Sequence, residues 1–506
     1  MFGLNISNAF KLIYIVLRIK FSKNCTRENK YVLVPNEGGL REILAILPLY
    51  LSIYNAGYKI AIYIPFRLIH LIPIYLLIGV SKFHFINTLR LPCLKSIDYK
   101  NIFDFQKYSY ASIMRKYKLE SVEALSNNEK VISRLNQKIS NIINNFSEIN
   151  FRNISAVFFT DYVYIPQGPI LDFLNSYHPN IALYSYSVGH LSDTLVVNNI
   201  YSNTINRRHP YAPPLELFEK NLKGLNVKDQ KNIIYKTLNK LNQLYAEKKW
   251  FNYVGTALYQ DGKTNKQDNK SMEKKGDSLI FAIFPHIYWD ASFSAGDDLF
   301  SNYRDWFEST VEYILRNTES KIIVKDHPSN LYKLNSIGEE YLSPIKSFIN
   351  KLTPSFKDRI IYYPPETKTS TLTLIKTADV TLTVRGTVGV EACLFDKKVI
   401  FAGSGRFNGY NFGIFPKTKE EYYFLIKKAS KKELIKKKND LYAAVYLDTL
   451  WNQMTFYQDF VQTKFTDDLN FKRSITCIDL KIIKKQINQL TKWLLSPTST
   501  YTNYSS

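Results

Sequence analysis

Residues 321–328 read KIIVKDHP, and residues 380–391 read VTLTVRGTVGVE. Each run begins as an apolar, β-branched strand and then breaks, the first at Pro328 and the second at Gly386. Charged and polar side chains therefore follow the carboxyl ends of two strands, which is where open α/β sheets bind nucleotides. The two runs predict a doubly wound α/β domain with a ligand site at its strand ends.

The rest of the chain predicts the same alternation of strands and helices. The second half should hold five strands, at 279–284, 321–325, 359–363, 380–384 and 398–401, with Ser370 or Thr369 capping one helix. The first half should hold strands at 31–35, 59–64, 82–86 and 156–159, and a long helix over 127–149. The expected fold class is α/β, with two Rossmann-like domains facing a cleft and helices at the C-terminus.

Length and composition set the expected domain boundaries. A chain of 506 residues is too long for one ordinary core. Residues 256–277 are rich in Lys, Asn, Asp and Gly without an apolar period, which is typical of a linker or mobile loop. We expect Rossmann-like domains over 1–255 and 278–415, then basic helices and a tail over 416–506.

The net charge restricts the expected partners, and the cysteine pattern restricts the expected compartment. The net charge of +23 favours anionic partners. Nucleic acid is not expected, because neither an aromatic RNA-binding signature nor zinc-finger spacing accompanies the charge. The four cysteines lie far apart without a CxxC pair, which predicts a reducing compartment and no zinc site or disulfide framework.

Residues 60–80 form the most membrane-like run, but Arg67, His70 and two prolines interrupt it. We expect a buried strand followed by an apolar helix here, because a central Arg opposes membrane insertion. A peripheral membrane contact stays open, since apolar helices beside basic residues can lie in the lipid interface.

The first ligand motif is Lys325-Asp326-His327-Pro328. An imidazole at a strand end can donate to a phosphate oxygen, and Lys325 can add positive charge. The alternative is a structural histidine that binds a backbone carbonyl.

The second motif is the turn at Arg385-Gly386-Thr387. Gly386 permits close approach, Thr387 is expected to cap a helix, and the amides that follow, including that of Gly389, would face a phosphate. Glu391 lies one turn further along and could accept from ribose hydroxyls. The alternative is an ordinary capped helix with an exposed glutamate.

These two motifs, K-x-H-P and R-G-T-x-G-x-E, followed by Phe401-Ala402-Gly403, carry a resemblance over roughly residues 279–412. They resemble bacterial capsule and surface-polysaccharide biosynthesis proteins of the GT-B type, and bacterial sialyl-, polysialyl- and capsular Kdo-transferases. The resemblance implies that the second domain binds the phosphate and ribose of a CMP-linked sugar. The implied nucleotide-sugar residues are Lys325, His327, Arg385, Gly386, Thr387, Gly389 and Glu391, with His286 from a loop after the first strand of that half.

The first half is similar to the acceptor domain of the same enzymes. Residues 36–42, NEGGLRE, match the glycine turn and glutamate that open it, although Arg41 replaces the small residue usual there. The resemblance implies that Gly38 and Gly39 line the acceptor site and that Glu42 is the general base. From the chemistry alone, Glu37 and Asp161 also qualify, because transfer to a sugar hydroxyl needs a group that removes its proton.

Three basic residues of the first half, His190, Arg207 and Arg208, could receive an anionic acceptor or a lipid-linked phosphate. The alternative is a solvated basic loop. Asp297-Asp298 should be the N-terminal cap of a helix, and a DxD metal pair is not seen at a strand end. We therefore expect transfer without a metal or cofactor, with His327 meeting the charge of the leaving phosphate.

The expected function is a glycosyltransferase that uses a nucleotide sugar to extend a surface polysaccharide or a lipid-linked acceptor. It should work in the cytoplasm, peripherally at the inner face of the inner membrane. An acidic sugar such as Kdo on CMP is the first choice of donor, and UDP-sugars stay open. The alternatives are a teichoic-acid-type polyol-phosphate transferase, with His286 as a second functional histidine, and a non-catalytic scaffold of capsule assembly that uses a basic helix at 427–438.

Overall fold

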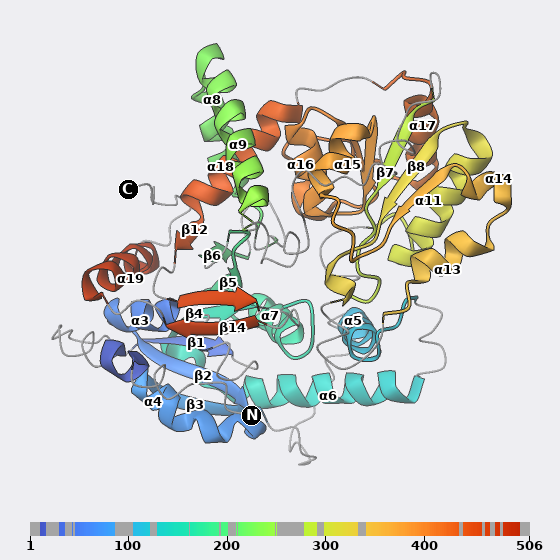
Figure 1. Ribbon diagram of the computed structural model, residues 1–506. Helices are drawn as coiled ribbons and strands as arrows, with labels where there is room; N and C mark the ends of the chain where they lie inside the picture. The colour runs from blue at the N-terminus through green and yellow to red at the C-terminus, as the bar shows by residue number, and fades with distance from the viewer. Residues whose placement is uncertain are drawn as a thin grey trace. The chain divides into compact units, whose positions relative to one another are not determined.

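A computed structural model gives the architecture (Figure 1). The residues that it describes are 11–16, 30–35, 43, 46–86, 105–121, 129–160, 162–191, 194–200, 209, 211–247, 249, 278–290, 298–331, 341–434, 439–457, 461–465, 471–475 and 479–495.

The chain divides into two compact units, and each unit is built from segments that are not contiguous in the sequence. Unit 1 comprises Met1–Ser112, Asn128–Tyr211 and Trp451–Ser506, and unit 2 comprises Ile113–Asn127 and Ala212–Leu450. This division differs from the expected ranges, since residues 212–255 cluster with unit 2 and residues 451–506 with unit 1. The expected linker at 256–277 lies outside the described residues.

Unit 1 is built on a seven-stranded sheet in the order β12-β6-β5-β4-β1-β2-β3. Strands β1 to β5 pair in parallel, and β6 and β12 join antiparallel at one edge. The strands are β1 (Tyr31–Pro35), β2 (Lys59–Pro65), β3 (Val80–Ile86), β4 (Ile154–Phe159), β5 (Ala182–Val188), β6 (Thr194–Asn199) and β12 (Thr455–Tyr457). The four strands expected in this half are confirmed.

The helices of unit 1 form where apolar residues recur at helical spacing. On the long helix α6, Ile139, Ile142, Ile143 and Phe146 are buried, and they pack with strand residues such as Val157 and Phe159 in one core. The unit contains η1 (Phe66–Leu71), η4 (Phe151–Asn153), α3 (Leu47–Asn55), α4 (Ile72–Leu77), α5 (Phe105–Tyr117), α6 (Glu129–Ser147), α7 (Gln167–Tyr177) and α19 (Leu480–Leu495). The chain passes from one unit to the other within α5.

Residues 60–80 do not form one continuous apolar helix. They fold as β2, η1, α4 and the start of β3, which confirms a strand followed by an apolar helix. Within the described parts of the chain, no helix is both long enough and apolar enough to span a bilayer.

Unit 2 is built on a five-stranded, fully parallel sheet in the order β11-β10-β7-β8-β9. The strands are β7 (Ile280–Ile283), β8 (Lys321–Lys325), β9 (Ile360–Tyr363), β10 (Val380–Thr383) and β11 (Lys398–Phe401). The helices are α8 (Leu215–Lys223), α9 (Val227–Ala246), α11 (Tyr303–Asn317), α13 (Pro344–Lys351), α14 (Pro354–Lys357), α15 (Thr371–Thr377), α16 (Thr387–Leu394), η5 (Gly405–Phe407), α17 (Lys419–Ser430) and α18 (Asn439–Gln453).

Helices cover both faces of this sheet, α15 and α16 on one side and α11 and α17 on the other (Figure 1). Period-two alternation decides which strand residue faces which layer. Phe281 and Ile322, for example, face the core that contains Trp306 and Tyr422, whose side chains share a hydrogen bond of 3.0 Å from the indole nitrogen to the hydroxyl. The expected class, α/β with two Rossmann-like sheets and C-terminal helices, is confirmed. The expected cleft between the domains stays a prediction.

The C-terminal part of the chain differs from the expectation of helices alone. It also contributes β12 to the sheet of unit 1 and a two-stranded hairpin of β13 (Val461–Phe465) and β14 (Phe471–Ile475). The expected basic helix over 427–438 is wrong in extent, since α17 ends at Ser430 and Lys432 has a φ of 63°. A residue with a positive φ does not continue a right-handed helix. Residues 435–438 lie outside the described part of the chain.

Candidate functional site

The strand order of unit 2 places a topological switch point between β7 and β10. From β7 the chain continues to β8 and β9 on one side of the sheet, and from β10 it continues to β11 on the other. The segments that follow β7 and β10 therefore leave in opposite directions from neighbouring strand ends, which is where open α/β sheets bind ligands. His286 follows β7 and Arg385 follows β10, so the fold brings these two predicted residues together.

His286 is fixed by contacts on both sides of its ring. Its Nε2 accepts a hydrogen bond of 3.1 Å from the backbone N–H of Arg385, and the ring stacks on Tyr303 with centroids 4.6 Å apart. Burial and the positive charges of Arg385 and Arg406 hold the pKa of His286 well below its ordinary value. A neutral imidazole that accepts a hydrogen bond at Nε2 carries its proton on Nδ1. His286 can therefore donate a hydrogen bond from Nδ1, but it cannot act as a base, because the lone pair of Nε2 already accepts from Arg385.

Arg385 is the buried cation of the site. Its side chain is 7% exposed, forms an ion pair with Asp298, and lies over the ring of Tyr303, with 5.7 Å from the guanidinium carbon to the ring centroid. The expected helix-capping role of Asp298 is wrong. Asn302 caps α11 instead, accepting from the N–H of Asp305 at 2.8 Å, because the chain still has to turn between Asp298 and the helix. Asp297 lies outside the described residues.

A second arginine of the site, Arg406, was missed by sequence reasoning. It follows β11, the neighbour of β10, and is 9% exposed. The residue before it, Gly405, has a φ of 47°, and a Cβ there would lie 2.8 Å from the Cβ of Arg385. Because glycine has no Cβ, the two arginine-bearing turns can approach each other closely here. The only signal in the sequence was the Gly403-Ser404-Gly405 turn after a strand.

His327 lies at the end of β8, beside β7, and is half-buried. Its Nδ1 accepts from the N–H of Ser329 at 3.1 Å, so the neutral ring carries its proton on Nε2. Nε2–H is a suitable donor to a phosphate oxygen.

Asp326 holds the His-Pro turn in place, and sequence reasoning gave it no role. Its buried carboxylate accepts five hydrogen bonds of 2.7–3.1 Å, from the N–H of His327 and from the side chains of Asn330, Tyr341, Ser343 and Tyr362. Burial raises the pKa of Asp326, and these hydrogen bonds oppose the rise. The available signal was an acid directly before His-Pro at a strand end.

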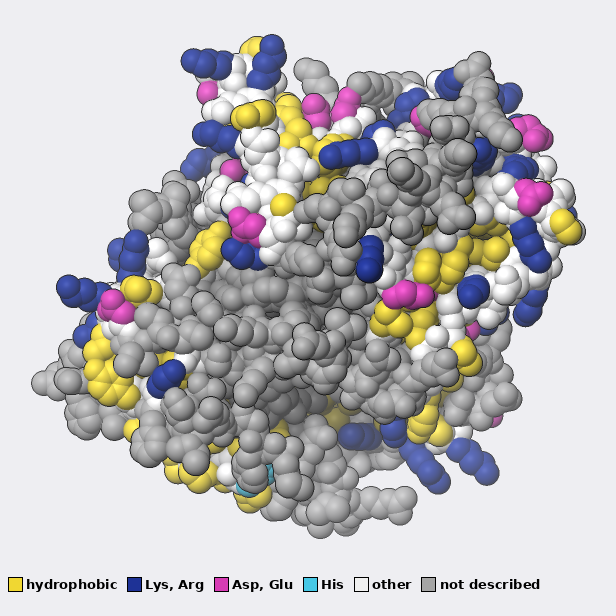
Figure 2. Space-filling view, viewed as in Figure 1, with side chains coloured by type: hydrophobic (Ala, Val, Ile, Leu, Met, Phe, Trp, Pro, Cys, Tyr) yellow, Lys and Arg dark blue, Asp and Glu magenta, His cyan; other side chains and the backbone are white. Residues whose placement is uncertain are grey.

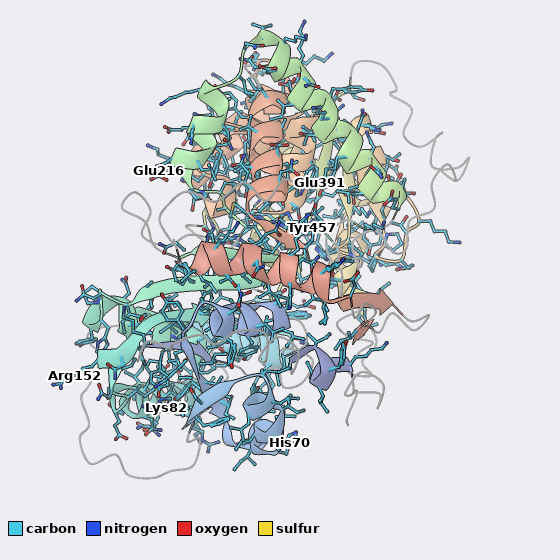
Figure 3. All side chains as sticks on the ribbon, turned by 90° about the vertical axis from the view of Figure 1, so that its left-hand side faces the viewer. His70, Lys82, Arg152, Glu216, Glu391 and Tyr457 are labelled. Carbon is cyan, nitrogen blue, oxygen red and sulfur yellow. The ribbon has the colours of Figure 1, made fainter. Side chains whose placement is uncertain are left out.

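Lys325 and Glu391 lie deeper than expected. The Lys325 ammonium donates to the hydroxyl of Thr371 at 3.0 Å and to the carbonyl of Thr369 at 3.3 Å. Glu391 is 2% exposed and accepts from the hydroxyl of Tyr245 on α9 at 2.5 Å, inside the unit (Figure 3). Lys325 thus supports the start of α15, and Glu391 joins α16 to α9. Direct contact of either side chain with a nucleotide stays a prediction.

Burial lowers the pKa of Lys325 to about 7, although the charge of Glu391 opposes this. Between pH 7 and the ordinary pKa of 10.5, the unfolded chain binds more protons than the folded one. Stability should therefore rise with pH across this window, by up to ~1.4 kcal/mol per pH unit. Lys325→Met should remove this rise, whereas Lys351→Met, at an exposed position, should retain it. Urea denaturation at a series of pH values measures both slopes, and equal slopes in the two variants would contradict the assignment.

The turn after β10 differs in detail from the prediction. Gly386 is the N-cap of α16 and Thr387 is its first helical residue, so the expected cap at Thr387 is wrong. The N–H of Gly386 instead donates to the hydroxyl of Thr383 at 3.2 Å. A Cβ on Gly389 would lie 2.3 Å from the ring of Phe401, so this glycine lets α16 pack closely on β11. The close-approach role of Gly386 toward a ligand stays a prediction.

Most predicted residues of the first half lie outside the described part of the chain: Glu37, Gly38, Gly39, Glu42, Asp161, Arg207 and Arg208. Strands β1 and β4 are parallel neighbours, so the segments containing Glu42 and Asp161 start from the same sheet edge. His190 follows β5, is 1% exposed, and lies 4.4 Å from the ring of Tyr211. Its role in acceptor binding stays a prediction.

Within the described residues, no group of three His, Cys, Asp or Glu side chains is arranged to hold a metal ion. The described site brings two arginines and two histidines together around a switch point, with Asp298 paired to Arg385, and the cationic and donor groups of this set are suited to binding an anion.

Residues 226–447 match the family model described as capsule polysaccharide biosynthesis protein. This match confirms the resemblance to capsule polysaccharide biosynthesis proteins that the two motifs indicated. The matched segment contains every residue of the site in unit 2. A comparison with curated proteins finds no match.

Among solved structures, the chain is similar to two structures of KpsC from Thermosulfurimonas dismutans. For the β-Kdo 2,7 transferase the identity is 12%, the coverage 92% of this chain and 100% of that one, and the TM-score 0.37. For the β-Kdo 2,4 transferase the identity is 12%, the coverage 67% of this chain and 88% of that one, and the TM-score 0.36. Anabaena Alr3699/HepE in complex with UDP has 10% identity, covers 92% of this chain and 99% of its own, and has a TM-score of 0.27.

Proposed function

We propose that this capsule-synthesis-type chain is a glycosyltransferase that takes a sugar from a nucleotide donor and adds it to a growing surface polysaccharide or lipid-linked acceptor. Unit 2 would bind the donor and unit 1 the acceptor. The preferred donor is an acidic sugar, such as Kdo, linked to CMP. The reaction would use neither a metal nor a cofactor, and the protein would act peripherally at the cytoplasmic face of the inner membrane.

The observation that carries the proposal is the convergence of Arg385, Arg406, His286 and His327 at the carboxyl ends of four adjacent strands. The neutral His286 and the Nε2–H of His327 would donate to phosphate oxygens, while the arginines supply positive charge. Such a set of fixed donors can stabilise the charge that develops on a leaving nucleotide phosphate.

This geometry also bears on the polyol-phosphate alternative. A second functional histidine would mark that reaction, and His286 could serve, but its Nε2 already accepts from the N–H of Arg385, which leaves Nδ1–H as a donor. The site in unit 2 therefore favours nucleotide-sugar binding without histidine base chemistry at His286.

A thermal-shift series with CMP, CDP, UDP, GDP and ADP tests the proposal. At about a hundredfold excess over Kd, a bound nucleotide should stabilise the protein by about 2.7 kcal/mol. His327→Ala should weaken binding by about ten- to a hundredfold, because one hydrogen bond to a charged phosphate is lost. His70→Ala, an exposed histidine of unit 1, is the matched control and should bind normally.

A shift selective for CMP that is lost in His327→Ala supports the acidic-sugar donor. A shift selective for UDP or GDP retains the glycosyltransferase and excludes the CMP donor. No shift with any nucleotide contradicts the proposal and favours a non-catalytic scaffold.

A further inference from the structure

A carboxylate lies inside the cationic site of unit 2. Asp298 forms an ion pair with Arg385, and the side chain of Asp298 is 22% exposed whereas that of Arg385 is 7% exposed. The carboxylate is therefore the more exposed member of the pair. An anion that reaches Arg385 from solvent also meets the negative charge of Asp298.

The backbone fixes Asp298 in this place. Asp298 forms an antiparallel bridge with Gly403, which follows β11, and the N–H of Leu299 donates to the carbonyl of Ala402 at 3.2 Å. Gly403 belongs to the same turn as Arg406, so the segment that carries Asp298 is joined to the segment that carries the second arginine. The carboxylate is thus a fixed part of the site.

A second aspartate, Asp290, lies close to the same groups. Burial raises the pKa of Tyr303, which lies under Arg385. The charge of Arg385 opposes this rise, and the charges of Asp298 and Asp290 add to it. The positive charges of Arg385 and Arg406 are therefore offset by two nearby carboxylates among the residues that the structure describes.

The charge of the whole chain acts in the opposite direction. Figure 2 shows Lys and Arg side chains at many places on the surface, with Asp and Glu side chains among them. The net charge of +23 attracts each anion according to its charge, so it would favour a nucleoside diphosphate over a monophosphate. Salt screens this long-range attraction over roughly 10 Å, so the charges inside the site have the stronger effect on selectivity.

We infer that Asp298 is a specificity residue that limits how much negative charge this site accepts. Its carboxylate would hold Arg385 in position for one phosphate, and it would oppose the further charge of a second phosphate at the same turns. The inference rests on the proposed function, since it concerns the phosphate group of the nucleotide bound there. It predicts discrimination by charge, which a purely structural partner of Arg385 would not provide.

Isothermal titration calorimetry with CMP and CDP, and with UMP and UDP, tests this role. For each base the diphosphate carries more negative charge than the monophosphate, so the ratio of their dissociation constants measures charge selectivity. Asp298→Asn should shift this ratio about tenfold or more in favour of the diphosphate, because a neutral amide does not oppose the additional charge. If Asp298 only held Arg385 in place, the substitution would weaken binding of both nucleotides equally.

Asp298→Ser is the second variant, since it removes the same charge with a smaller side chain and should shift the ratio in the same direction. Circular dichroism of each variant distinguishes lost binding from lost folding. Asp358→Asn is the matched control. Asp358 is exposed and precedes β9, so it lies at the opposite edge of the parallel sheet, where the strands begin. This substitution changes the net charge by the same amount, and the ratio should stay within about twofold.

Two results would overturn the inference and leave the proposed function in place. One is nucleotide binding with the same ratio in Asp298→Asn as in the unchanged protein. The other is an equal shift of the ratio in Asp358→Asn, which would assign the selectivity to the net charge. If the unchanged protein binds none of these nucleotides, the inference and the proposed function are both overturned.

Discussion

Replacing Asp326 with alanine should lower the free energy of unfolding by about 3–5 kcal/mol, because several buried hydrogen-bond donors are left without an acceptor. Five donors lose their common acceptor, and four of them are side chains from Asn330, Tyr341, Ser343 and Tyr362. Water cannot easily replace a carboxylate that has no exposed surface. Denaturant unfolding followed by circular dichroism measures the loss.

Asp326→Asn provides a sharper version of this test. The asparagine has the same shape, but it directs an NH2 group toward a set of donors, so most of the destabilisation should remain. Asp358→Ala is the control, since this aspartate is exposed, and its effect should stay within about 0.5 kcal/mol. If Asp326→Asn were as stable as the unchanged protein, the carboxylate would not be the anchor of the His-Pro turn.

Glu42→Gln should reduce turnover by about 10²–10⁴-fold if Glu42 is the general base of the transfer. The glutamine keeps the size of the side chain but cannot accept the proton of the attacking hydroxyl. Nucleotide affinity should be unchanged, because the proposed donor site lies in unit 2. Turnover is measured as nucleotide release and as mass of the extended saccharide, with the donor that the thermal-shift series identifies.

The matched variants are Glu37→Gln and Asp161→Asn, which replace the other two candidate bases. Strands β1 and β4 are parallel neighbours that end at the same sheet edge, each before a segment that contains one or two of the candidates. Only one of the three should show the full loss of turnover with normal nucleotide binding. A large loss in Asp161→Asn, with Glu42→Gln near normal, would move the base to Asp161. Normal turnover in all three variants would place the base elsewhere.

Local sequence patterns predicted the strands of unit 2 to within about one residue. Each is a short apolar run that ends at a turn residue, and such a run has few other ways to bury itself. Ser370 was also predicted as a helix cap, and its hydroxyl accepts from the N–H of Thr373 at 3.2 Å. Strands β5 and β6 were missed, because ALYSYSV and TLVVNN mix polar residues into the pattern and acquire burial only from their neighbours.

The sequence by itself determined that the chain is an α/β protein and that His327 and Arg385 follow strand ends. Periodicity, glycine and proline act over a few residues, so they can be read without the rest of the fold. Only the tertiary structure decided that β7 lies beside β10, that Arg406 joins the site, and that Lys325 and Glu391 are buried beneath it. These outcomes depend on pairings between segments that lie far apart in the chain. Strand pairing and burial are properties of the assembled sheet, and a local sequence pattern does not encode them.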